Sequence, residues 1–128
     1  MVEHKLLYVV DDDEIFHFIV KRMLESRGNN LVVTSFLSGE DALEQLAVTQ
    51  RPPSLILLDI NMQSMNGWEF IEAYRNIKNT HNRDIPIIMC SSSLDVRDMQ
   101  KVEGTPELRA YITKPLDVQK MKMIEQYL

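Results

Sequence analysis

The sequence has one cysteine and no long apolar segment, and each of these shortages excludes a class of protein. Cys90 is the only cysteine among 128 residues, so no internal disulfide can form. It lies in the apolar run Ile87–Cys90, where a thiol usually behaves as a small hydrophobic side chain. No run approaches the roughly 18 apolar residues of a membrane span. Leu6–Val10 is too short for the core of a signal peptide. We therefore expect a cytoplasmic protein without a membrane anchor.

Basic clusters and grouped histidines are also scarce. Lys and Arg number 14 against 19 Asp and Glu, for a net charge of −5, and no basic run is denser than Lys21-Arg22. Binding to a nucleic-acid backbone is therefore not expected as the main activity. The three histidines, His4, His17 and His81, are scattered and follow no predicted strand. We expect them to be surface or packing residues, and zinc chemistry is not indicated.

The length favours a single unit. A chain of 128 residues matches the usual size of one domain, about 100–150 residues, and is long enough to bury a hydrophobic core without a metal or disulfide. We see no internal repeat and no low-complexity linker. We expect residues 1–128 to form one domain.

Short apolar runs alternate with stretches of helical spacing. The runs predict strands at Lys5–Val10, Leu31–Phe36, Leu55–Leu58, Ile85–Cys90 and Arg109–Thr113. Helices are predicted over 15–24 with a stop at Gly28, from a capping-box-like start at Ser38 to about 49, and over 70–77, 95–102 and 118–128. Five such units favour an α/β fold with an open, doubly wound parallel sheet and helices on both faces, because a barrel would need eight.

Polar side chains follow four of the predicted strands. Asp11–Glu14 follows the first strand, Asp59 the third, Ser91–Ser93 the fourth and Thr113–Pro115 the fifth. Each segment has an ordinary structural explanation as a helix start, a turn, a cap or an exposed charge. The carboxyl ends of parallel strands meet at one sheet edge, however, and ligands of such folds bind there. Four coincidences together favour a site.

The charges of these groups indicate a divalent cation. Asp11, Asp12 and Asp59 supply −3 and Lys114 returns +1, while two carboxylates about 4 Å apart repel by roughly 4 kcal/mol at an effective dielectric of 20. Oxygen ligands without histidine or thiolate favour Mg²⁺. A carboxylate beside Mg²⁺ and a lysine can attack phosphorus, so an aspartyl phosphate is a candidate product.

The chain resembles the receiver domains of two-component response regulators, in particular the stand-alone chemotaxis type. The matching motifs are Val9-Val10-Asp11-Asp12, Leu57-Leu58-Asp59-Ile60-Asn61-Met62, Met65-Asn66-Gly67, Ile87-Ile88-Met89-Cys90-Ser91 and Tyr111-Ile112-Thr113-Lys114-Pro115. The resemblance implies a flavodoxin-like, five-stranded parallel sheet of strand order 2-1-3-4-5. It also implies a cis Lys114-Pro115 bond.

The resemblance further implies a chemical role for each residue of the acidic site. Asp59 resembles the acceptor of a phosphoryl group from a sensor histidine kinase or a histidine phosphotransfer protein. Asp12, Asp59 and the backbone carbonyl of Asn61 resemble the Mg²⁺ ligands, and Asp11 acts mainly through a bound water. Lys114 resembles the lysine that pairs with the acyl phosphate.

Ser91 and Tyr111 resemble a switch pair, in which the hydroxyl turns to a phosphoryl oxygen and the aromatic ring rotates inward. The surface of the fourth helix, fifth strand and fifth helix would then change for a downstream protein that the sequence does not identify. Homodimerisation on phosphorylation is left open by the sequence.

Some positions depart from the family pattern. Gln63 stands in place of the usual proline, Asn66 replaces a frequent aspartate, and Ser92 replaces a small alanine. Glu107-Leu108 occupies the place of the usual Gly-Ala before the fifth strand.

Two other functions use related features. A haloacid-dehalogenase-like phosphatase also forms an aspartyl phosphate, but it needs an aspartate where this chain has Asn61. An interaction module could keep the fold without the phosphorylation chemistry. We expect a signalling phosphoacceptor that catalyses only its own phosphorylation and dephosphorylation.

Overall fold

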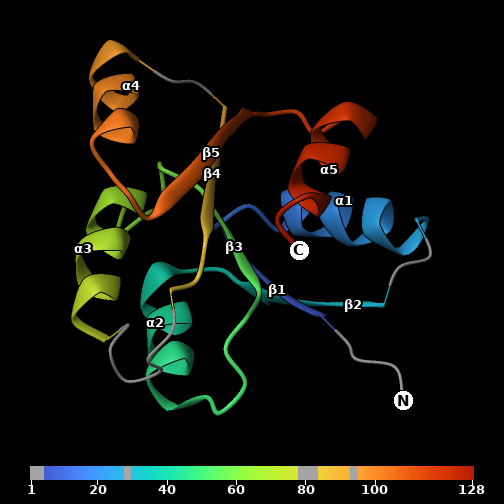
Figure 1. Ribbon diagram of the computed structural model, residues 1–128, viewed down its shortest axis with the longest axis horizontal. Coiled ribbons are helices and arrows are strands. Elements are labelled where there is room, and N and C mark those ends of the chain that lie inside the picture. Colours follow the sequence, from blue (N-terminus) through green and yellow to red (C-terminus); the bar gives the residue numbers. More distant parts are fainter. Residues whose placement is uncertain (1–4, 28–29, 78–83, 93–94) are drawn as a thin grey trace.

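The computed structural model describes residues 5–27, 30–77, 84–92 and 95–128, which form a parallel sheet with helices on both faces (Figure 1). The strands are β1 (Lys5–Val10), β2 (Leu31–Phe36), β3 (Leu55–Leu58), β4 (Ile87–Ser91) and β5 (Leu108–Thr113). The helices are α1 (Glu14–Glu25), α2 (Gly39–Val48), α3 (Gly67–Ile77), α4 (Val96–Glu103) and α5 (Val118–Glu125). The strand order is β2-β1-β3-β4-β5, which confirms the predicted doubly wound, flavodoxin-like fold.

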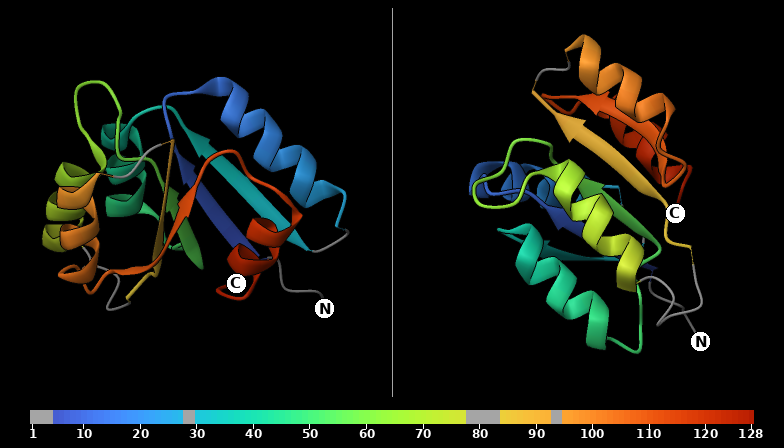
Figure 2. Two further views of the ribbon diagram at one scale, coloured as in Figure 1. Left: turned by 90° about the horizontal axis from the view of Figure 1, so that it is seen from above. Right: turned by 90° about the vertical axis from the view of Figure 1, so that its left-hand side faces the viewer.

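The core has two layers, one on each face of the sheet. Leu7 and Val9 of β1 pack with α1 and α5, whereas Tyr8 and Val10 pack with α2 and α3. Figure 2 shows α1 and α5 on one side of the sheet and the other three helices on the opposite side. Every residue of β3 is buried, because this central strand is covered on both faces. This burial explains the continuous apolar runs in the sequence.

The strand predictions hold at β1, β2 and β3, and local chemistry shifts the other two. β4 begins at Ile87 rather than Ile85, because Pro86 has no N–H to donate to a strand partner. The N–H of Ile85 instead donates to the Tyr74 hydroxyl at 3.1 Å. β4 also runs one residue further than predicted, through Ser91, and β5 begins one residue earlier, at Leu108.

The helix predictions hold in place but not at every end. Ser38 caps α2 by accepting from the N–H of Asp41 at 3.1 Å, as the sequence pattern indicated. α3 begins at Gly67, before the first residue of its apolar stripe, and α5 ends at Glu125 rather than at residue 128. α1 ends at Glu25, and the predicted stop at Gly28 lies outside the described residues.

In the parts of the chain that the structure describes, no helix is both long and apolar enough to cross a bilayer. The expected cytoplasmic location stays a prediction.

Candidate functional site

Three strand ends bring carboxylates and one ammonium group together at the same edge of the sheet. Asp11 follows β1, Asp59 follows β3 and Lys114 follows β5. The Nζ atom of Lys114 lies 2.6 Å from Asp11 Oδ2 and 3.8 Å from Asp59 Oδ2. Carboxylate oxygens of Asp11, Asp12 and Asp59 all lie within 4.8 Å of one another. The predicted convergence of these four side chains is therefore present.

Asp11 is held by hydrogen bonds on all sides. Its N–H donates to the carbonyl of Phe36 at 3.0 Å, and its Oδ1 accepts from the N–H of Asp13 at 2.9 Å. Its carbonyl lies 2.7 Å from Nε2 of His17, which is a buried residue of α1. His17 is thus a packing residue, as predicted, but it also fixes the turn that presents the acidic site. Its bond to a backbone atom leaves no trace in the sequence pattern.

Asp59 is buried beside another acid. Burial and the charge of Asp11 raise the pKa of Asp59 from 3.8 to about 6, and the charge of Lys114 opposes this rise only in part. Its side chain is 8% exposed. A nearby positive charge would therefore stabilise the ionised form of the Asp59 carboxyl.

Lys114 is enclosed by its partners. Burial lowers the pKa of Lys114, but the bond to Asp11 and the charge of Asp59 outweigh this effect, so the net pKa lies above the usual value. Its Nζ lies 4.3 Å from the ring centroid of Phe16, and its backbone N–H donates to the carbonyl of Ser91 at 2.8 Å. The Lys114-Pro115 bond is cis, as expected.

The loop after β3 is pinned at two points. The N–H of Gly67 donates to the carbonyl of Ile60 at 2.8 Å, and a Cβ at Gly67 would lie 2.5 Å from the backbone oxygen of Asp59. Only glycine fits this approach. The N–H of Gln63 donates to Asp12 Oδ2 at 3.1 Å, a bond that the usual proline could not make. Asn61 lies exposed between these points.

Two buried hydroxyl groups, on neighbouring strands that end at this edge of the sheet, have no hydrogen-bond partner among the described residues. Ser91, at the end of β4, is 1% exposed. Its hydroxyl lies near Asp59 and lowers the pKa of the Asp59 carboxyl, but the contact does not have the geometry of a hydrogen bond. The hydroxyl of Tyr111 on β5 is also unpaired, and this strand pairs with β4. Unpaired buried hydroxyls are costly, which favours a state in which they gain partners.

The donor set fits a hard divalent cation. The clustered carboxylates carry more negative charge than Lys114 neutralises, and all three offer oxygen ligands. Asp12 is exposed, so the site opens to solvent on one side. The residues present therefore fit Mg²⁺.

Comparisons with known proteins identify the family. The model of the response regulator receiver domain matches residues 7–125. A protein-glutamate methylesterase/protein-glutamine glutaminase of Clostridium acetobutylicum is 35% identical over 119 residues, which cover 89% of this chain and 32% of that protein. The DNA-binding transcriptional regulator NtrC of Escherichia coli is 31% identical over 118 residues, or 91% of this chain and 23% of that protein. The chain thus spans 23–32% of the length of these relatives.

One solved structure is similar to this protein over nearly the whole length of both chains. A two-component response regulator from Cytophaga hutchinsonii superposes with a TM-score of 0.83 and 29% identity, covering 98% of this chain and 96% of that one. The fold, the matched region and the sequence identities agree, and the chain belongs to the response regulator receiver domain family of two-component systems.

Proposed function

We propose that this chain is a phospho-accepting receiver and that residues 1–128 act as one such domain. Asp59 accepts a phosphoryl group from the phosphohistidine of a sensor histidine kinase or a histidine phosphotransfer protein. The observation that carries this proposal is the position of Lys114 Nζ, which contacts Asp11 and lies 3.8 Å from the Asp59 carboxylate.

The transfer replaces one bond to phosphorus with another. A carboxylate oxygen of Asp59 attacks the phosphorus, the N–P bond of the donor breaks, and the imidazole keeps the electron pair and takes up a proton. Lys114 then pairs with the phosphoryl oxygens instead of with a bare carboxylate. Burial and the charge of Asp11 raise the pKa of Asp59, so a neighbouring positive charge favours its ionised, nucleophilic form.

Asp12, Asp59 and the carbonyl of Asn61 would hold Mg²⁺, with Asp11 acting through a water molecule. Bound there, Mg²⁺ supplies positive charge that offsets repulsion between the acids and the incoming phosphoryl group. The Gln63 N–H orients Asp12 from the solvent side.

The switch begins with the unpaired hydroxyls. Phosphorylation adds about two negative charges and several acceptor oxygens, so Ser91 gains a partner that it lacks here. Tyr111 then moves into the space that the Ser91 hydroxyl leaves. The exposed surface formed by α4, β5 and α5 changes for a downstream protein or a second copy of the chain, by a shift between two packings.

Acetyl phosphate with Mg²⁺ tests the proposal directly. Intact-mass spectrometry should show one adduct of about 80 Da, the mass of one phosphoryl group. Asp59→Asn should abolish the adduct, whereas Asp13→Asn, a change at a neighbouring exposed acid, should retain it. Absence of the adduct with every phosphodonor would instead support a phosphorylation-independent interaction module.

A further inference from the structure

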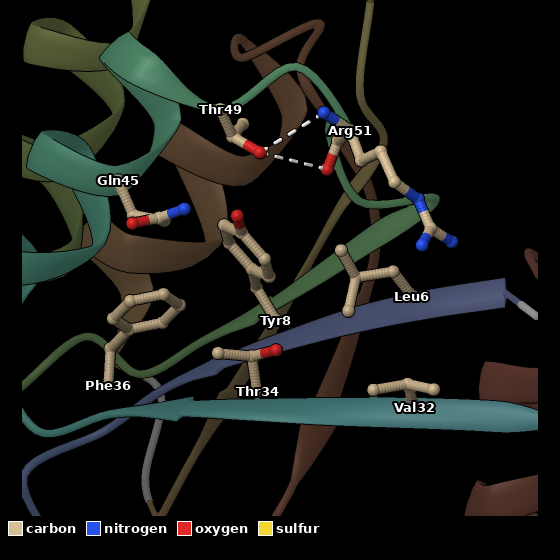
Figure 3. Close-up of a pocket in the computed structure, with 8 residues that line it drawn as sticks. All are labelled: Leu6, Tyr8, Val32, Thr34, Phe36, Gln45, Thr49 and Arg51. Carbon is tan, nitrogen blue, oxygen red and sulfur yellow. Dashed lines mark hydrogen bonds between the residues drawn. The ribbon is translucent and has the colours of Figure 1, made fainter.

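A cavity separate from the acidic site lies on the face of the sheet that α2 covers, and no residue of the acidic site lines it. Its volume is about 440 Å³, toward the lower end of the range of roughly 300–1,000 Å³ for small-molecule sites. The lining residues are Leu6, Tyr8, Val32, Thr34, Phe36, Gln45, Thr49 and Arg51. Figure 3 shows β1 and β2 forming its floor, with α2 and the segment after it on the other sides.

The floor is apolar and partly aromatic. The rings of Tyr8 and Phe36 lie 4.8 Å apart between centroids and are tilted by 60°, and because Tyr8 is only 2% exposed, Phe36 supplies the aromatic surface that is open to solvent. Leu6 and Val32 extend the apolar surface beside them, and Val32 is 47% exposed, because β2 is an edge strand. A flat apolar body would cover this surface and displace water from it.

Hydrogen bonds to backbone atoms hold the rim of the cavity in place. The Thr49 hydroxyl accepts from the N–H of Arg51 at 3.1 Å and donates to its carbonyl at 3.2 Å (Figure 3). The N–H of Ser54 donates to the carbonyl of Leu6 at 2.8 Å, which ties the same segment to β1. Two prolines between these anchors further restrict the backbone. The rim is therefore shaped before any ligand arrives.

The rim also gives the cavity one charge. Arg51 is the only charged residue among the eight that line it, and its guanidinium has no carboxylate partner in the described part of the chain. Thr34 and Gln45 add uncharged polar groups. A guanidinium with free donors binds carboxylates by charge-assisted hydrogen bonds.

We propose that this cavity is a binding site for a small aromatic monocarboxylate. The ring of the ligand lies on Leu6 and Val32, beside Phe36, and its carboxylate pairs with Arg51. The proposal does not depend on phosphorylation of Asp59.

Binding can be tested on the full chain with 4-fluorobenzoate, and with 4-fluorobenzamide as its uncharged analogue. Titrations followed by ¹⁹F and ¹H–¹⁵N NMR should give saturable shifts at amides of β2 and of the Thr49–Arg51 segment. Arg51→Gln should weaken binding of the carboxylate about tenfold and leave the amide unchanged, as loss of one charge-assisted pair requires. Arg97→Gln, a change at an exposed arginine of α4, is the matched control and should alter neither probe.

Thr34→Phe should block both probes by filling the cavity, with circular dichroism to verify the fold. The proposal is overturned if the unmodified chain gives no saturable shift at millimolar probe. It is equally overturned if Arg51→Gln weakens both probes alike or if the shifts centre on Asp11–Asp13. A partner protein that protects this face while neither probe binds would identify a protein-docking surface instead.

Discussion

At the residue scale, Asp59 combines a destabilising position with the proposed role of phosphoacceptor. Its pKa is raised to about 6, so the folded protein holds this proton more tightly than the unfolded chain does. As the pH rises from about 4 to 6, the unfolded state loses the proton first and stability falls. The full penalty is about 3 kcal/mol above this window. The proposed phosphoryl transfer would account for an acid at this position, because it requires the charged carboxylate.

We therefore expect Asp59→Asn to stabilise the Mg²⁺-free protein by about 2–3 kcal/mol at pH 8 and by almost nothing at pH 4. Urea unfolding across this pH range, with EDTA present, measures the difference. A variant that is less stable than the parent at pH 8 would show that the acidic cluster carries no such repulsion.

Gln63 contacts Asp12 through its backbone N–H, so substitutions at this position can separate the effect of the backbone donor from that of the side chain. Its N–H donates to Asp12, so Gln63→Pro removes the donor and Gln63→Ala keeps it. Because groups that orient metal ligands affect affinity strongly, we expect Gln63→Pro to weaken Mg²⁺ binding roughly tenfold and Gln63→Ala to leave it nearly unchanged. Isothermal titration calorimetry provides the readout. Equal affinities for the two variants would exclude a role for this hydrogen bond.

At the scale of elements, α4 differs from α1, α2, α3 and α5 in how little of it is buried. None of its residues is fully buried. The Nε1–H of Trp68 on α3 donates to Asp98 Oδ1 at 3.1 Å, and Lys101 Nζ lies 5.3 Å from the centre of a Trp68 ring. Trp68 is partly exposed at the start of its helix. Its side chain therefore links α3 to the helix of the proposed switch surface.

Trp68→Phe removes the N–H and keeps an aromatic ring. We expect hydrogen exchange in α4 to speed up about tenfold, as loss of one hydrogen bond implies, while exchange in α1 stays unchanged. Lys101→Gln is the matched change at the other contact and should have a smaller effect. Exchange that rises throughout the sheet would instead mean that Trp68 supports the whole fold.

The start of β5 explains one departure from the family pattern. Glu107 replaces a small residue, and its carboxylate accepts two hydrogen bonds from Arg75 on α3, at 2.8 and 3.0 Å. This paired geometry lets an acid occupy a position that is only 9% exposed. The sequence showed the departure, but the partner lies 32 residues away and was not predicted.

At the scale of the whole molecule, Mg²⁺ should act as a stabilising ligand. The chain carries a net charge of −5, and three of its acids converge on one site. A ligand that binds only the folded state stabilises it by about 2.7 kcal/mol at a concentration 100 times its Kd. We expect the Tm to rise with the logarithm of Mg²⁺ concentration.

Sodium chloride at equal ionic strength should reproduce little of this rise, because general screening is weaker than binding. Asp12→Asn should remove most of it. Asp13→Asn should retain it, because the side chain of Asp13 caps α1 and asparagine can also cap. Differential scanning calorimetry distinguishes these cases. A rise that persists in Asp12→Asn would place the bound ion elsewhere.

The sequence by itself determined the alternation of strands and helices and the edge of the sheet where acids and lysine meet. Both follow from local patterns: apolar runs mark buried strands, and the residue after each run lies at a strand end. Only the tertiary structure decided which backbone groups hold those acids, how Glu107 is paired, and that a cavity opens beside Tyr8. These features join residues far apart in the chain through backbone atoms and ring surfaces, and no periodicity in the sequence records such contacts.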